Sequence, residues 1–173
     1  MSSSALAAPA QQRGARYWLR AWLPVLVAIA LVAIESTPYF GSDCTSGPLR
    51  HVWEWLFGPV RDRTWHILHV LIRKSGHFTG FGLVGLTWLR AWRMTLSKAS
   101  FLRVEIFAMI GTALVASADE YHQSFLPNRT SSPRDVLLDC IGALAMIAVA
   151  HRFLKRRAIV RPVEKVNKEL TLG

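Results

Sequence analysis

Four long apolar segments, separated by polar and turn-forming residues, dominate the pattern along the chain. They run from residue 18 to 34, from about 68 or 76 to 92, from 101 to about 118, and from 135 to about 154. Each is close to the roughly 20 residues that an α-helix needs to cross the hydrocarbon core of a bilayer. None alternates apolar and polar residues with a period of two, as a transmembrane barrel requires. The pattern predicts an all-α, polytopic membrane protein, a bundle of about four transmembrane helices.

The first apolar segment has a second interpretation, because basic residues precede it as they do in a cleaved signal peptide. Residues 34–38, IESTP, offer no small-residue cleavage site, which favours a retained membrane helix. Residues 1–16 are expected to form a disordered N-terminal tail, since they are mostly small and polar. The predicted membrane domain spans residues 17–155, and residues 156–173 form a basic C-terminal tail.

The stretch between the first two apolar segments, residues 40–64, is predicted to be a loop, because glycine and proline recur in it. These residues are Gly41, Gly47, Pro48, Gly58 and Pro59. Inside the loop, the sequence HVWEWLF is expected to form a short interfacial helix with Trp53, Leu56 and Phe57 toward lipid.

Small residues on the second and fourth apolar segments predict close helix packing. The second segment carries a glycine face that includes Gly76, Gly80, Gly82 and Gly85. Gly142 supplies a matching small residue on the fourth segment. Because glycine lets two helix backbones approach closely, these segments are expected to lie side by side.

Composition strengthens the membrane assignment. Of 173 residues, 51% are apolar and only 18% are charged, against roughly 25% charged in an average globular chain. The apolar content excludes a disordered chain, and the presence of only two cysteines excludes a disulfide scaffold. Cys140 is expected to pack as a small apolar residue rather than to pair with Cys44.

The basic charge of the chain indicates its orientation rather than a nucleic-acid partner. The net charge is +10, yet four apolar blocks divide the basic residues and leave no continuous basic face for nucleic acid. Most Lys and Arg lie in the two terminal tails and in the loop between the second and third segments. By the positive-inside rule both termini are predicted to be cytoplasmic, in a multi-pass protein of the bacterial cytoplasmic (inner) membrane.

A stripe of basic residues opens the second segment. His66, His69, Arg73 and His77 share one helical face, and Lys74 flanks it. Ionisable groups at membrane depth are candidate site residues. The alternative for Arg73 and Lys74 is an anchoring role at the headgroups, and His66 and His69 are expected in a loop or at the interface. No HExxH motif accompanies the histidines, so no metal site is predicted.

The third segment ends in a second polar group. Asp119, Glu120, His122 and Gln123 follow an uninterrupted apolar run, and Glu120 and Gln123 share a face if the helix continues. Such a group can orient a headgroup or transfer a proton. Because carboxylates at the carboxyl end of a helix oppose its dipole, a cationic partner is expected nearby. The alternative is a helix that simply leaves the membrane.

The loop before the fourth segment supplies the remaining candidates. Arg129 lies in this loop, and Ser132 followed by Pro133 predicts the cap and first residue of a helix. Asp135 then has a structural explanation in the first turn of that helix. Asp139 lies one turn deeper on the same face, where a capping role no longer explains it.

Together these residues resemble the VanZ-like family of small bacterial membrane proteins, named after an accessory protein of teicoplanin resistance. The residues that carry the resemblance are Lys74, His77, Asp119, Glu120, Gln123, Arg129, Asp135, Asp139 and Gly142. It covers about residues 20–155 and implies a fold and a membrane setting more than a reaction. In two places the chain departs from the family pattern, with Phe81 where Tyr is frequent and Asp139 where Asn is common.

The candidate site is therefore a polar pocket on the outward side of the membrane. Its residues are Lys74, His77, Asp119, Glu120, Gln123, Arg129, Asp135 and Asp139. We expect it to bind an anionic lipid or cell-wall precursor headgroup, with Lys74, His77 and Arg129 as cationic contacts. One alternative is an enzyme acting on a lipid headgroup, with His77 or His122 as acid or base and Glu120 as its partner. Another is a structural or assembly subunit. No cofactor is indicated.

Overall fold

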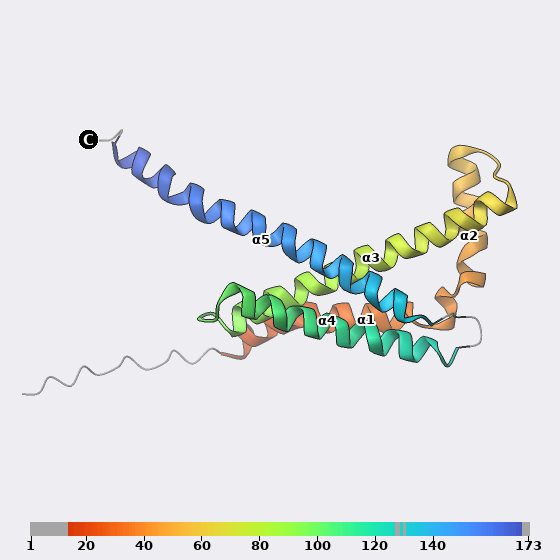
Figure 1. Ribbon diagram of the computed structural model, residues 1–173, viewed down its shortest axis with the longest axis horizontal. Coiled ribbons are helices and arrows are strands. Elements are labelled where there is room, and N and C mark those ends of the chain that lie inside the picture. The colour runs from red at the N-terminus through yellow and green to blue at the C-terminus, as the bar shows by residue number, and fades with distance from the viewer. Residues whose placement is uncertain (1–13, 127–128, 130, 171–173) are drawn as a thin grey trace, which may run out of the picture.

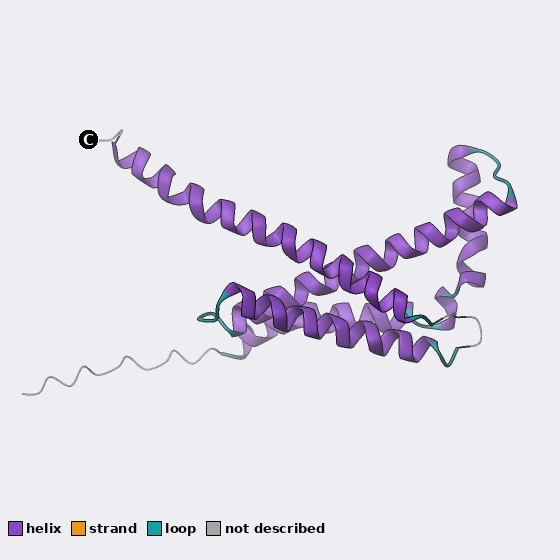
Figure 2. Cartoon of the chain, viewed as in Figure 1, coloured by secondary structure: helices purple, strands orange, loops and turns teal. Residues whose placement is uncertain are grey.

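The computed structural model describes residues 14–126, 129 and 131–170, with side chains up to Lys155. In this part of the chain the secondary structure is helical throughout, as Figure 2 shows, which confirms the predicted all-α class. The elements are α1 (Ala15–Glu35), the 3-10 helix η1 (Pro38–Phe40), α2 (Ser42–Phe57), α3 (Asp62–Thr95), α4 (Phe101–Gln123) and α5 (Pro133–Leu170). Residues 1–13, most of the predicted N-terminal tail, lie outside the described residues.

In the described part of the chain, three helices are long and apolar enough to cross a membrane: α1, α4 and residues Pro133–Lys155 of α5. Their outer faces carry large exposed apolar side chains, such as Leu31 on α1 and Leu114 on α4. This distribution suits a lipid environment, where no water drives apolar groups inward. α3 is longer, at 34 residues, but less apolar, because Gly, His, Thr and Trp recur in it.

α3 is the central element of the bundle. It packs against α1, α4 and α5, whereas α1 and α4 contact each other only weakly. In Figure 1, α5 crosses α3, and the first half of α3 projects beyond the bundle together with α2. Two apolar clusters fill the bundle interior, one around Leu89, Val104 and Ile147 and one around Phe81 and Ala116.

The closest helix contact joins α3 to α5 and confirms the predicted role of Gly142. A Cβ atom placed on Gly142 would lie 2.1 Å from the carbonyl oxygen of Phe78, which leaves room for a hydrogen only. Gly82 and Gly85 also face α5 at short range. Gly76 and Gly80 do not belong to this contact, because a Cβ on either would meet no atom within 4 Å.

The short helix predicted for residues 51–57 is confirmed, but the loop predicted before it is wrong for residues 42–50, which form the first part of the same helix, α2. Gly47 and Pro48 lie inside this helix. Pro48 has no backbone N–H, so α2 lacks the hydrogen bond that this residue would otherwise donate one turn back. The predicted short helix is therefore extended at its N-terminus, and its Trp55 and Phe57 side chains are largely exposed.

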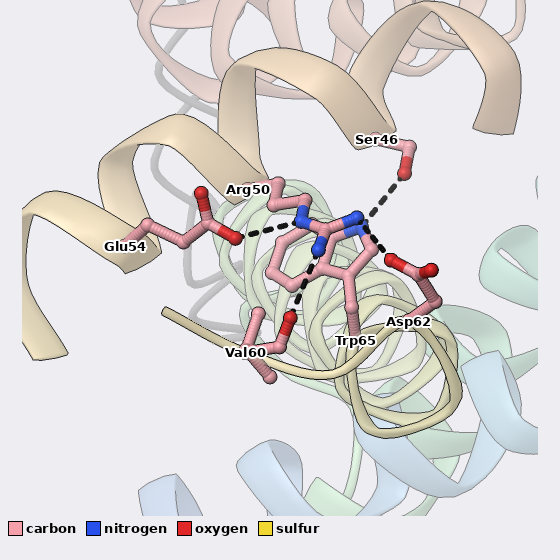
Figure 3. A network of polar contacts seen from close by, with 6 residues as sticks. All are labelled: Ser46, Arg50, Glu54, Val60, Asp62 and Trp65. Atoms are coloured by element: carbon pink, nitrogen blue, oxygen red, sulfur yellow. Dashed lines mark hydrogen bonds and ion pairs between the residues drawn. The ribbon is translucent and has the colours of Figure 1, made fainter. Parts of the chain in front are cut away.

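A polar network around Arg50 holds α2 against the start of α3 (Figure 3). The Arg50 guanidinium donates to Glu54 at 2.8 Å, to Asp62 at 2.7 Å and to the backbone oxygen of Val60 at 2.9 Å. Its hydrogen bond to Glu54 lowers the pKa of that carboxyl below its usual range. Beside this network, the Trp65 indole donates to Ser46 at 2.8 Å. Polar contacts of side chains thus replace an apolar core in the α2–α3 hairpin.

The Gly142→Ala variant should be unstable, because its methyl group would overlap the backbone of α3. Overpacking of this kind costs about 1 to 3 kcal/mol and exceeds that range when the backbone cannot move. Gly76→Ala is the matched control, since it adds the same methyl group in open space and should be neutral or slightly stabilising. Thermal unfolding in detergent, followed by circular dichroism, checks this. Equal melting temperatures for the two variants would contradict the close contact.

Candidate functional site

The polar residues gather where α1 and α4 end and α5 begins, which we call the polar end of the bundle. α4 continues through the polar group to Gln123, five residues beyond the predicted end near residue 118. The loop from Ser124 to Ser132 then returns the chain to α5, while α3 passes alongside with Lys74 and His77. All eight candidate residues therefore lie at this end, supplied by α3, α4, α5 and the loop.

Lys74 on α3 is neutralised by Asp135 on α5. Its Nζ lies 2.5 Å from Asp135 Oδ1, and half of the Lys74 side chain is exposed. Asp135 belongs to the first turn of α5, which Pro133 opens, and the Ser132 hydroxyl accepts from the Arg134 N–H at 3.2 Å. The predicted helix start is confirmed. Lys74 is therefore a partly satisfied cation rather than a free one.

A second pair joins the same two helices one turn deeper. His77 Nδ1 lies 3.5 Å from Oδ1 of Asp139, whose side chain is fully buried. Neither of these groups has a hydrogen-bond partner in the described part of the chain, and the His77 ring stacks on Phe81 with their centroids 6.2 Å apart. A buried carboxylate is costly without a cation or donor. The imidazole of His77 is the group in position to supply one.

The α4 carboxylates occupy two different environments. Asp119 Oδ2 accepts from the Gln123 amide at 2.9 Å, one helical turn away, while Asp119 Oδ1 has no partner among the described residues. Glu120 Oε2 accepts from the backbone N–H of Ser132 at 2.8 Å. Glu120 therefore holds the loop against α4. It is not the partner of His77 or His122, although the enzyme alternative expects it to be. His122 instead contacts Ser36 Oγ, at 2.9 Å.

Arg129 closes the carboxyl end of α1. Its Nη2 donates to the backbone oxygens of Glu35, at 2.5 Å, and Thr37, at 3.0 Å. A cation at this position satisfies carbonyl groups that the helix leaves open and complements the helix dipole. Arg129 was predicted to contact a ligand, but its guanidinium donates to backbone groups within the protein.

From the sequence, Arg73 has two possible roles, an anchor at the lipid headgroups and a residue of the site. Its side chain is half-buried at the polar end, and none of the described residues forms a hydrogen bond or ion pair with it. The sequence signal for a role in the site was its place on the helical face that carries His66, His69 and His77. His69, in contrast, was expected in a loop or at the interface and is buried in α3, with Nε2 3.2 Å from the Thr45 hydroxyl.

His77 borders three adjoining hollows at the polar end. The largest is a groove of about 390 Å³ between α1 and α3, with Gly76, Gly80 and Leu31 among its lining residues. Two smaller hollows, of about 140 and 190 Å³, both include Arg73. The groove falls within the size range of small-molecule sites, roughly 300–1,000 Å³. It is apolar along its length and reaches polar residues at one end.

No group of three His, Cys, Asp or Glu side chains in the described structure is arranged to hold a metal ion. Cys44 and Cys140 are both free thiols. Cys140 is half-buried and Cys44 is exposed, in agreement with the expectation that they do not pair.

Comparison with known families identifies the chain. The sequence pattern of the VanZ/LLP1 family matches residues 21–155, which include most of α1, all of α2 to α4 and the apolar part of α5. The chain belongs to the VanZ/LLP1 family. The resemblance seen in the sequence is thus confirmed over nearly the range expected. Comparisons with curated proteins and with solved structures give no match.

In this VanZ/LLP1 protein, His77→Ala should destabilise the bundle by about 3 kcal/mol, the lower end of the range for a broken buried pair. Asp139→Asn should leave stability unchanged or raise it, because the amide carries no charge that needs compensation. In the Asp139→Asn background the His77→Ala change should cost at least about 1 kcal/mol less. SDS titration in mixed micelles measures all four free energies of unfolding.

The matched control is His66→Ala, which removes an exposed histidine from the same helix. Additive effects of His77→Ala and Asp139→Asn would show that the two side chains do not interact.

Proposed function

We propose that this protein crosses the bacterial cytoplasmic membrane four times, through α1, α3, α4 and α5, with its polar end outward and both termini cytoplasmic. A helix of 34 residues spans about 51 Å at 1.5 Å per residue, so α3 has ample length to cross. Its contacts with three apolar helices cover its less apolar surface. The side that holds both termini would carry 14 of the 21 basic residues, in accord with the positive-inside rule.

This orientation predicts that Cys44 is accessible from outside the cell. In the Cys140→Ser variant, a membrane-impermeant maleimide added to intact spheroplasts should label Cys44, which is exposed. The control is Lys98→Cys in a chain without Cys44 and Cys140, because the exposed Lys98 lies in the loop between α3 and α4. That position should be labelled only after permeabilisation. Labelling at position 98 in intact spheroplasts, with Cys44 labelled only after permeabilisation, would show the opposite topology.

The ligand that the polar end suits best is an amphiphile, a lipid or lipid-linked cell-wall precursor with a phosphate in its headgroup. The observation that carries this proposal is the groove between α1 and α3, which joins an apolar channel to a cluster of polar side chains around His77. A lipid has the same distribution of properties along its length. The groove opens between helices with apolar outer faces, which gives a chain in the bilayer a lateral route of entry.

The phosphate would lie near Arg73. This guanidinium has no protein partner among the described residues, and it borders two hollows that meet the groove at His77. A planar guanidinium suits phosphate oxygens because it can donate two parallel hydrogen bonds. Lys74 lies on the rim of one of these hollows and adds a second positive charge.

A link to teicoplanin resistance belongs to the same proposal. A precursor held in this pocket would be less available to a lipoglycopeptide on the outer face of the membrane. This step comes from the family resemblance, and lipid binding is the part of the proposal that the geometry supports.

Filling the groove tests the proposal. Gly80→Leu places a side chain in the groove, and its Cβ would meet no atom within 4 Å, so the fold should persist. Native mass spectrometry of the purified protein should find a phosphate-bearing lipid on the wild type. In Gly80→Leu the Kd for this lipid should rise at least tenfold, about 1.4 kcal/mol of binding free energy.

Gly47→Leu is the matched control for this measurement. It makes the same substitution in open space on α2, away from the groove, and should retain lipid as the wild type does. Equal lipid content in all three proteins would overturn the groove as a binding site and favour the structural-subunit alternative.

A further inference from the structure

Negative groups outnumber positive ones at the polar end. Five carboxylates lie there, from Glu35, Asp119, Glu120, Asp135 and Asp139. The permanently charged cations among the described residues of this end are four, Arg73, Lys74, Arg129 and the exposed Arg134. Lys74 is paired with Asp135, and Arg129 is bound to backbone carbonyls. This balance does not match a headgroup that is only an anion.

Asp119 is the carboxylate that lacks a positive partner where the groove ends. Its side chain is 93% buried, since its relative exposure is 7%, and its Oδ1 has no hydrogen-bond partner in the described structure. Asp119 lines both the groove between α1 and α3 and an adjoining hollow of about 310 Å³. A carboxylate oxygen buried without a donor is energetically costly, so a donor from a ligand would stabilise it.

A second carboxylate borders the same end of the groove. Glu35, the last residue of α1, lines the groove together with Asp119, and no ion pair within the described residues engages it. Neither lysine nor arginine is among the groove's lining residues. Arg73 lies in the neighbouring hollow, which shares Glu35, Gly76 and His77 with the groove. Asp119 therefore lies in the groove apart from Arg73, and Glu35 lies where the groove and the Arg73 hollow meet.

We propose that the headgroup bound at the polar end carries a primary ammonium as well as a phosphate. The ammonium donates to Asp119 and Glu35 at the end of the groove, and the phosphate meets Arg73 in the adjoining hollow. An ammonium has three N–H donors and can serve both carboxylates, whereas a trimethylated amine has none. This inference rests on the proposed lipid-binding function and specifies the class of ligand within it.

Two sources provide this chemistry: an aminophospholipid such as phosphatidylethanolamine, and the free amine of a lipid-linked muropeptide. Both combine a phosphate, an amine and a hydrocarbon chain. They differ in the distance between these groups, so direct comparison of the two compounds distinguishes them.

The first experiment titrates the delipidated full-length protein with dioleoyl phosphatidylethanolamine, phosphatidylglycerol and phosphatidylcholine, with native mass spectrometry as the readout. We expect phosphatidylethanolamine to bind at least tenfold more tightly than the other two. Glu35→Gln and Asp119→Asn should each reduce this preference to threefold or less, with little change for phosphatidylglycerol. Arg73→Gln should weaken phosphatidylethanolamine and phosphatidylglycerol alike.

Glu54→Gln is the matched control. It removes a carboxylate on α2 that binds Arg50 and does not line the groove. Glu35→Gln keeps the test valid if Asp119→Asn does not fold, since Glu35 is exposed. A parallel titration compares a polyprenyl-pyrophosphate muropeptide with its N-acetylated form. Preference for the free amine there, with none for phosphatidylethanolamine, would assign the site to the precursor.

Two outcomes separate this inference from the function on which it rests. If phosphatidylglycerol binds as well as phosphatidylethanolamine, N-acetylation has no effect on the muropeptide, and Gly80→Leu still abolishes lipid binding, only the ammonium is overturned. If Gly80→Leu binds every lipid as the wild type does, the groove itself is overturned, and the ammonium with it.

Discussion

The arrangement of this protein depends on one contact, the approach of the α5 backbone to the α3 backbone at Gly142. The space between Gly142 and the carbonyl oxygen of Phe78 admits no side chain. In a membrane no hydrophobic effect draws apolar helices together, so close packing at small residues becomes a main source of their association. The contact also fixes which residues of α3 face α5. His77, the residue next to Phe78, is thereby brought to Asp139, three residues before Gly142.

The ionisable groups of the polar end are mostly satisfied within the protein. Asp135 faces Lys74, Glu120 holds the backbone of the loop at Ser132, and Arg129 caps α1. These contacts join four separate segments of the chain at one end. The burial of so many charged groups is stable only because most of them have partners. Among the described residues that line the groove and the hollows beside it, Arg73, Glu35 and Asp119 have no ion pair.

The groove lies between α1 and α3, with Asp119 and Gln123 of α4 at its polar end. Gly76 and Gly80 leave the α3 side of the groove open, so glycines on one helix serve two purposes. Those at positions 82 and 85 permit helix contact, and those at 76 and 80 leave space. The result is an apolar groove that ends beside Asp119, whose Oδ1 has no partner among the described residues, and this is the geometry an amphiphile requires.

The sequence by itself determined the helical class, the apolar segments, the family and the residues of the polar end. Apolar runs of bilayer length and polar residues at their ends are local features, so they are readable without a structure. It also predicted the contact at Gly142, because small residues on two segments permit close packing. It failed for the first part of α2, residues 42–50, where glycine and proline suggested a loop. Some of the contacts that hold this helix come from Asp62 and Val60, which lie beyond it in the chain.

Only the tertiary structure decided which ionisable groups pair. From sequence, Lys74 and Arg129 looked like ligand contacts and Glu120 like the partner of a histidine. Lys74 pairs with Asp135 on α5, Arg129 donates to backbone carbonyls at the end of α1, and Glu120 accepts from the backbone N–H of Ser132. The sequence separations are 61 residues for Lys74 and 94 for Arg129. Helical periodicity orders residues within one helix but carries no information on the rotation of one helix against another. That rotation, set by the α3–α5 contact, determined which charges are neutralised and which remain for a ligand.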